Sequence, residues 1–181
     1  MTSRRDRPLS DGVVRLRRPT ETDVPDLIEI FSDAEIQRWT RAESPFTEKR
    51  ARELLGYLIR DWDEETGAAF AIEDASTGEL LGTIGMHFLP GGIGEIGYSV
   101  RAEARGHGIA TRSLRLLVEW GFGSGARARL QLITEPGNVP SQRLAERVGF
   151  RREGLLRSYA VLKGERRDFL MYGLLPADPR G

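Results

Sequence analysis

The chain has 181 residues, of which 39% are apolar and 30% charged, a mix typical of one globular domain that excludes a disordered or fibrous chain. Its 27 basic and 27 acidic side chains cancel, so no net charge favours nucleic acid or an anionic membrane as a partner. The absence of Cys excludes a disulfide framework, a thiol nucleophile and a thiolate zinc site, and with only His87 and His107 we expect no metal.

The first eleven residues contain three Arg and no apolar stretch, so they do not form a secretory signal. We expect a loose arm over residues 1–11, one domain over 12–175 and a tail over 176–181. No run of 18 apolar residues exists, which predicts no membrane span. We therefore expect a soluble, cytoplasmic protein.

Alternation over residues 13–17 predicts a first strand. Thr20 or Thr22 then caps a helix with Pro25 in its first turn, residues 39–46 form a loop, and Thr47 caps a second helix that continues to about residue 62. After this helix the hydrophobic pattern changes from helical spacing to alternation, with turn residues at 76–78 and 90–92. Three strands are predicted as an antiparallel meander: 69–73, 80–88 and 93–100.

The second half predicts a helix over 108–122, a strand over 130–134, a helix over 139–148, and strands over 156–161 and 169–174. Helices and strands are segregated rather than alternating along the chain. This order predicts an α+β fold with a mixed, largely antiparallel sheet of seven strands and about four helices, not a doubly wound sheet.

A glycine-rich turn, Arg105-Gly-His-Gly-Ile-Ala110, connects a predicted strand to a predicted helix. Its backbone amides and the positive end of the helix dipole suit phosphate oxygens, although a purely structural tight turn has the same sequence pattern. A P-loop does not fit, because no Gly-Lys-Ser/Thr triplet is present. The dinucleotide fingerprint lacks a third Gly where Thr111 stands, but Glu135 could serve as its ribose-binding acid, so a nucleotide-binding oxidoreductase stays open.

Five segments together resemble the GNAT superfamily of N-acetyltransferases, and more narrowly its RimJ/RimL-like branch: Glu95-Ile-Gly-Tyr-Ser-Val100, Arg105-Gly-His-Gly-Ile-Ala110, Asn138-Val-Pro-Ser141, Glu146-Arg-Val-Gly-Phe150 and Glu153-Gly154. The resemblance runs from about residue 13 to residue 175. It implies a three-layer fold with the sheet splayed into a V, acetyl-coenzyme A as cosubstrate, and a primary amine or a peptide N-terminus as acceptor. Relatives commonly dimerise, so a homodimer is among the states that the resemblance implies.

The resemblance also implies roles for individual residues. The cofactor-binding positions are Tyr98, Ser99, Val100, Arg105, Gly106, His107, Gly108, Ile109, Ala110, Thr111 and Asn138. The strand edge at 98–100 pairs with the pantetheine arm, and the amides of the turn hold the pyrophosphate. The alternative role for Asn138 is that of a plain helix cap, and one residue can fill both roles.

Glu95 is the candidate base and Ser141 the candidate donor of a proton to the leaving thiolate. Glu95 could instead be a solvent-facing residue opposite a cross-strand Arg, and Ser141 an ordinary third helical position. Acceptor contacts are expected from Trp39, Phe46, His87 and Tyr159, with Arg41 and Trp62 nearby, although a strand histidine and core aromatics explain the same pattern.

Besides the nucleotide-binding oxidoreductase, two functions are weighed. The first is an N-acetyltransferase in which the amine attacks acetyl-coenzyme A directly in a ternary complex, since no Cys is present to carry an acetyl group. The second is a protein that binds coenzyme A as a sensor or scaffold without turnover.

Overall fold

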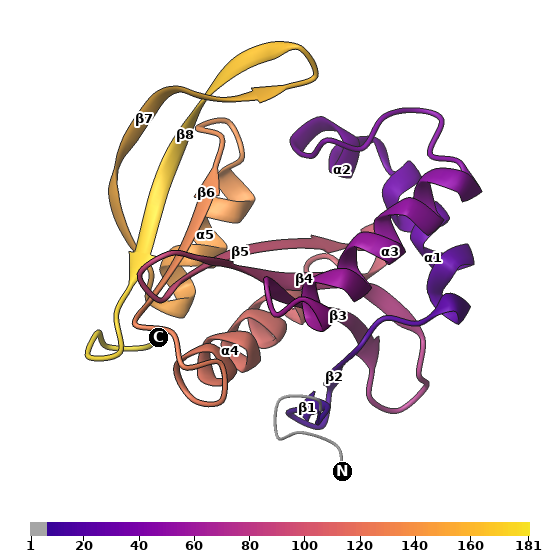
Figure 1. The fold of residues 1–181 in the computed structure, drawn as a ribbon, viewed down its shortest axis with the longest axis horizontal. Helices are drawn as coiled ribbons and strands as arrows, with labels where there is room; N and C mark the ends of the chain where they lie inside the picture. The colour runs from indigo at the N-terminus through magenta and orange to yellow at the C-terminus, as the bar shows by residue number, and fades with distance from the viewer. Residues whose placement is uncertain (1–6) are drawn as a thin grey trace.

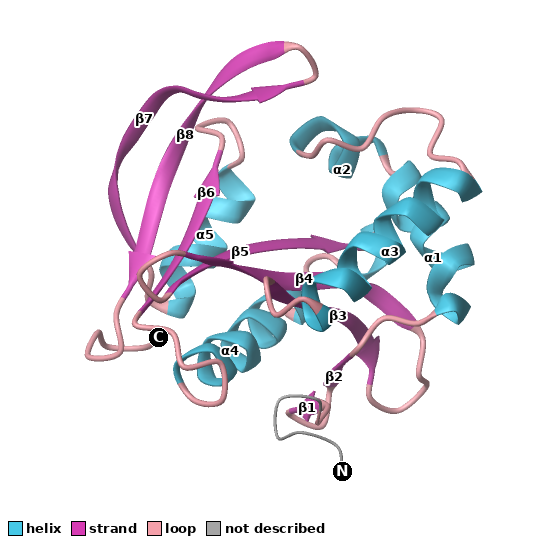
Figure 2. Ribbon diagram, viewed as in Figure 1, coloured by secondary structure: helices cyan, strands magenta, loops and turns pink. Residues whose placement is uncertain are grey.

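One mixed sheet runs through the computed structural model, which describes residues 7–181 (Figures 1 and 2). In this range the sheet has eight strands in the order β1-β2-β3-β4-β5-β6-β8-β7. The strands are β1 (Leu9–Ser10), β2 (Val14–Arg17), β3 (Gly67–Asp74), β4 (Leu80–Leu89), β5 (Ile93–Val100), β6 (Arg129–Thr134), β7 (Arg151–Leu162) and β8 (Glu165–Leu174). The helices are α1 (Val24–Ser32), α2 (Ala34–Trp39), α3 (Glu48–Asp63), α4 (Ile109–Phe122) and α5 (Val139–Val148), with 3₁₀ turns η2 (Glu21–Asp23) and η3 (Ala102–Ala104).

The predicted fold class is confirmed, with one more strand and one more helix than expected. The additional strand β1 pairs Leu9 with Leu16 of β2, so the end of the predicted loose arm is wrong. Residues 1–6 of that arm lie outside the described residues. The additional helix α2 starts where Asp33 takes an extended conformation and its carboxylate accepts a hydrogen bond from the Ile36 amide at 2.9 Å.

The meander β3-β4-β5 is antiparallel throughout, as predicted. Thr47 caps α3 through its side chain, and Gly108 is the N-cap of α4, close to the predicted start of each helix. The last two strands are longer than predicted. In β8 the predicted range 169–174 is the packed half of the strand, whereas β7 has exposed side chains over most of its length, inside and outside the predicted range.

The sheet splits between β5 and β6. These two strands are parallel and pair only over Ile93–Glu95 and Arg129–Gln131. Beyond this point they diverge, and Figure 1 shows β6, β8 and β7 turned away from β3, β4 and β5. Among residues 7–181, the β5 edge from residue 96 to residue 100 therefore has no strand partner on that side.

The helices pack on the sheet through two hydrophobic cores. Helices α4 and α5 pack on one face of the sheet, where Leu114, Leu117 and Tyr172 are fully buried. Helices α1 to α3 cover the other face around Leu27 and Leu55. None of the helices of residues 7–181 is apolar over a length that would cross a bilayer.

The predicted tail at residues 176–181 lies against the end of α5. Gly149 follows this helix with φ +103°, and a Cβ at this position would lie 2.7 Å from the Pro179 carbonyl oxygen. Asp178 forms an ion pair with Arg151 at 3.2 Å. The close backbone approach explains why a glycine ends α5.

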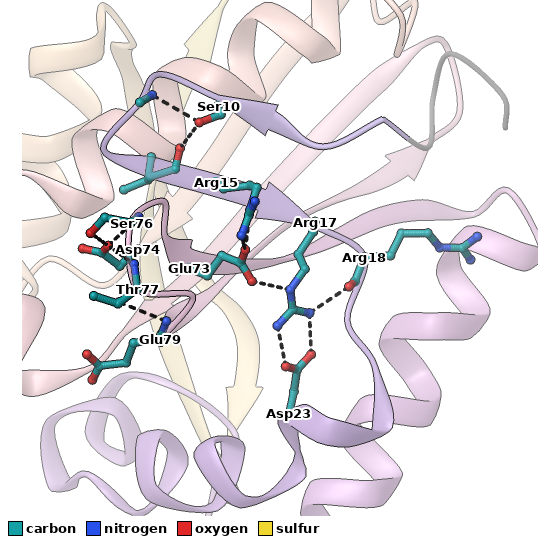
Figure 3. A network of polar contacts seen from close by, with 12 residues as sticks. Ser10, Arg15, Arg17, Arg18, Asp23, Glu73, Asp74, Ser76, Thr77 and Glu79 are labelled. Carbon is teal, nitrogen blue, oxygen red and sulfur yellow. Dashed lines mark hydrogen bonds and ion pairs between the residues drawn. The ribbon is translucent and has the colours of Figure 1, made fainter.

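A buried ion network connects β2 to the 3₁₀ turn η2 and to β3 (Figure 3). The Arg17 guanidinium donates two hydrogen bonds to Asp23, at 2.7 and 2.9 Å, and its Nε donates to Glu73 of β3. Asp23 is 3% exposed and Glu73 4% exposed. Arg17 is thus the cation that compensates two buried carboxylates, with Arg15 as a second, more exposed partner of Glu73.

Replacing Arg17 by Met is expected to lower the free energy of unfolding by about 2–4 kcal/mol, because removing one partner leaves buried charges uncompensated. Urea denaturation measures this difference. Arg52→Met is the matched control: Arg52 also contacts two carboxylates, Glu21 and Glu48, but on the surface, where water screens the charges, so a much smaller change than for Arg17→Met is expected. Equal effects of the two variants would contradict the role assigned to burial.

Candidate active site

A cavity of about 960 Å³ occupies the split between β5 and β6. Its walls come from α2, α3, β4, β5, the start of α4, the β6–α5 connection and the β7–β8 hairpin. The predicted site residues that line it are Trp39, His87, Glu95, Tyr98, Ser99, Val100, Arg105, Gly106, Gly108, Ile109, Ala110, Thr111, Asn138 and Ser141. Segments separated by about a hundred residues in the sequence therefore meet at one place.

Three predicted residues do not line the cavity. Phe46 is buried in the core and stacks on Phe31, so the prediction of an acceptor contact is wrong for Phe46. Tyr159 lies in the irregular part of β7, where it is 48% exposed and meets Phe169 edge to face. The side chain of His107 is exposed and does not line the cavity. Trp62 is also a core residue, whose Nε1 donates to the Ala69 carbonyl oxygen.

The turn before α4 has the geometry of an anion cradle. Gly106 and Gly108 both have φ +79°, in the left-handed region, and a Cβ at either position would meet no atom within 4 Å. Within residues 7–181, no side-chain hydrogen bond caps the first turn of α4, so its first amides are available to a ligand. The turn is thus open rather than closed by its own side chains, as a bound anion requires.

The arginines of this region are already paired. Arg105 forms an ion pair with Asp33 at 2.5 Å, and its Nε donates to the Val100 carbonyl oxygen at 3.1 Å. Arg112 pairs with Asp11 at 2.8 Å. The positive field of the cradle therefore comes mainly from backbone amides.

Tyr98 connects the two sides of the split. Its hydroxyl lies 2.9 Å from Ser141 Oγ, and burial raises the pKa of Tyr98, so this group stays protonated. Asn138 caps α5 by accepting a hydrogen bond from the Ser141 amide at 3.2 Å. Backbone and side chain of Ser141 are therefore both held in place.

Glu95 lies at the last paired position before the split. Its Oε2 accepts a hydrogen bond from Gln131 Nε2 at 2.8 Å, and Gln131 is the residue that faces it on β6. On the other side, His87 of β4 stands directly opposite Glu95. The cross-strand neighbours of Glu95 are thus an amide and an imidazole, not the Arg that the structural alternative assumed.

Helix α2 reaches across the cavity. The indole of Trp39 lies against Gly137 in the β6–α5 connection, where a Cβ would be 3.2 Å away, and its Nε1 donates to Glu35 at 2.6 Å. Lys163, at the turn of the β7–β8 hairpin, donates to the Gln37 carbonyl oxygen. Two segments from the far side of the split therefore touch α2, which covers this part of the cavity.

Gln131 and Asp61 were missed at the sequence level. Gln131 supports the cavity through its contact with Glu95 on a distant strand, Asp61 lines the cavity from α3, and neither belongs to a recognised motif. Strand register is the one signal that could have found Gln131, because a predicted parallel pair β5–β6 places it beside Glu95.

The comparison with known families decides the identity. The model of the acetyltransferase (GNAT) domain matches residues 14–151. The chain belongs to the GNAT acetyltransferase family. A relative of this GNAT protein is the uncharacterized N-acetyltransferase p20 of Bacillus licheniformis, 33% identical over 170 residues that cover 92% of this chain and 94% of p20.

Solved structures of other GNAT proteins share this fold. RimJ of Mycobacterium smegmatis, solved with a coenzyme A disulfide, is 26% identical, with a TM-score of 0.83 over 94% of this chain and 86% of that one. RimL, a ribosomal L7/L12 alpha-N-protein acetyltransferase solved with coenzyme A, is 23% identical, with a TM-score of 0.81 over 93% and 96%. The GNAT protein described here is thus an acyl-coenzyme A dependent N-acetyltransferase with acetyl-coenzyme A as cosubstrate. Its family membership removes the nicotinamide alternative.

The residues of the cavity fit this cosubstrate. The open glycine turn suits a pyrophosphate, since no side chain occupies the space in front of its amides. The unpaired edge of β5 offers backbone donors and acceptors to an extended arm, as an added strand would. Arg143 and Arg147 line the cavity from α5 and add positive charge for an anionic ligand. Across the described part of the chain, no three His, Asp or Glu side chains lie together as metal ligands would.

Proposed function

We propose that this GNAT protein acetylates a primary amine, on a peptide N-terminus or a small molecule, by direct attack in a ternary complex. The observation that carries the proposal is one cavity that holds both the glycine cradle and the Glu95 carboxylate. Acetyl-coenzyme A supplies the acetyl thioester when bound. The protein's own contribution is to orient the two substrates and to move two protons.

Glu95 takes up the proton that the attacking amine loses, at the oxygen not engaged by Gln131. How much the reaction needs this base depends on the pKa of the acceptor amine. An α-amine with a pKa of about 7.7–8.0 is partly neutral near pH ~7.5, whereas a Lys amine with a pKa of about 10.4 is only about 0.1% neutral. A peptide N-terminus is therefore the easier acceptor for a half-buried carboxylate.

Ser141 Oγ gives a proton to the leaving sulfur, and Tyr98 acts through Ser141. Because the pKa of Tyr98 is raised by burial, its hydroxyl keeps a proton that it can donate to Ser141 Oγ. Ser141 thus regains its proton from Tyr98, and solvent reprotonates Tyr98 before the next turnover.

Replacing Tyr98 by Phe is expected to lower kcat about 10-fold and leave the Kd of coenzyme A unchanged, since only a hydroxyl is removed. Steady-state rates and calorimetric titration measure the two values. If Tyr98 acts through Ser141, Tyr98→Phe will have no further effect in a Ser141→Ala background. Additive losses in the double variant would contradict this coupling.

The function itself is tested by thiol release. Purified protein, acetyl-coenzyme A and a panel of amines and peptides are mixed, and free coenzyme A is followed with a thiol reagent. Release that depends on the amine supports the proposal. Tight binding of coenzyme A without release from any acceptor would instead support the sensor or scaffold function.

A further inference from the structure

Asp61 is a buried carboxylate that the proposed reaction does not use. It stands in the last turn of α3, is 8% exposed and lines the cavity. Its Oδ1 accepts a hydrogen bond from Thr66 Oγ1 at 3.1 Å, and within residues 7–181 no Arg or Lys forms an ion pair with it. A carboxylate taken out of water without a cation is costly, so a ligand cation is its natural partner.

The position of Asp61 relative to Glu95 follows from the sheet register. Gly67, His87 and Glu95 are directly opposite one another on β3, β4 and β5, so they share one face. Asp61 lies against the Gly67 end of this row of residues, because a Cβ atom at Gly67 would lie 2.9 Å from Asp61 Oδ2. Glu95 stands two strands away, a distance of about 10 Å. His87 separates the two carboxylates.

From this arrangement we infer that Asp61 binds a second cationic group of the acceptor, whose other amine is the one acetylated near Glu95. This inference rests on the proposed function and narrows its substrate class. The acceptor carries a second ammonium or guanidinium group several bonds from the reacting nitrogen. A diamine and a peptide N-terminus followed by a basic side chain both have this chemistry.

The other polar groups near Asp61 are consistent with a cation. Tyr57 lines the same wall, and its pKa is raised by burial and by the charge of Asp61. Its hydroxyl therefore stays neutral. Arg41 lines the rim, but it is exposed, so water screens its charge more than that of the buried Asp61. His87 lies between the carboxylates and is exposed.

The test compares matched acceptors in the thiol-release assay. The small acceptors are butylamine and 1,4-diaminobutane. The peptides have the same length and an N-terminal Ala followed by Gln, Lys or Glu. We expect kcat/KM to be at least about 10-fold higher for the dicationic member of each set. The set with the higher value identifies the source of the cation, a small amine or a peptide.

Asp61→Asn is expected to raise KM for the dicationic acceptors about 10-fold, with kcat and the monocationic acceptors unchanged. Asp63→Asn is the matched control, because Asp63 is exposed on the same helix and pairs with Arg18 at 2.8 Å. The comparison of acceptors on the unaltered protein needs no variant to fold.

The outcomes separate the two proposals. Equal kcat/KM for monocationic and dicationic acceptors would overturn the inference and leave the proposed function intact. A preference for the Glu peptide would overturn it in favour of a carboxylate bound at Arg41. No thiol release from any acceptor, with coenzyme A still bound, would overturn the proposed function and this inference together.

Discussion

Replacing Gly108 by Val is expected to weaken coenzyme A binding about 100-fold or more. Gly108 has φ +79°, a conformation that costs a residue with a side chain roughly 1–2 kcal/mol. Its missing Cβ points into open space at the start of α4, and a branched side chain would fill the volume in front of the helix amides. Phosphate oxygens could then not approach the backbone donors.

Gly78→Val separates backbone strain from the loss of the ligand site. Gly78 has φ +77° in the turn between β3 and β4, and a Cβ added there would also meet no atom within 4 Å, but this glycine does not line the cavity. Both variants should lose similar stability. Only Gly108→Val should lose the rise in melting temperature that saturating coenzyme A produces, because that rise depends on the ratio of ligand concentration to Kd. An unchanged Kd in Gly108→Val would contradict the placement of the phosphates.

The parts of the fold that could be predicted are those with local signals. Alternation marks β4 and β5, a short continuous apolar run marks β3, and two glycines define the turn that opens α4. Strand β1 has two residues and α2 has six, too few for a period to show. Asp33 ends one helix and caps the next, so the sequence pattern merges α1 and α2.

The site residues also divide into those with a local sequence signal and those without one. Motif residues on β5 and at the start of α4 were placed from the sequence, because chain neighbours form that part of the cavity. Phe46 was misplaced since an aromatic after a loop packs equally well in a core, and only the tertiary contact with Phe31 decides between the two. Asp61 lies against Gly67, where the lack of a Cβ leaves room for its carboxylate, and no motif around Asp61 marks this contact.

Glu95→Gln is expected to lower kcat by about 10²–10³-fold, the usual contribution of a general base, and to leave the Kd of coenzyme A unchanged. The substitution keeps the size of the side chain, and its amide oxygen can still accept from Gln131 Nε2. The expected fall in kcat therefore results from the lost basicity of the carboxylate and not from a change in packing. Glu119→Gln, on the exposed face of α4, is the control and should keep full activity.

The factor by which Glu95→Gln lowers kcat should depend on the acceptor amine. An amine of lower pKa arrives partly neutral and needs the base less, so the ratio of wild-type to Glu95→Gln rates should shrink as the acceptor pKa falls. Gln131→Leu should lower kcat by about 10-fold with the same acceptor trend, because it leaves the carboxylate in place but removes the donor that orients it. If Glu95→Gln lowered kcat by the same factor for all acceptors, Glu95 would only shape the cavity. The amine would then have to lose its proton to bulk water before it binds.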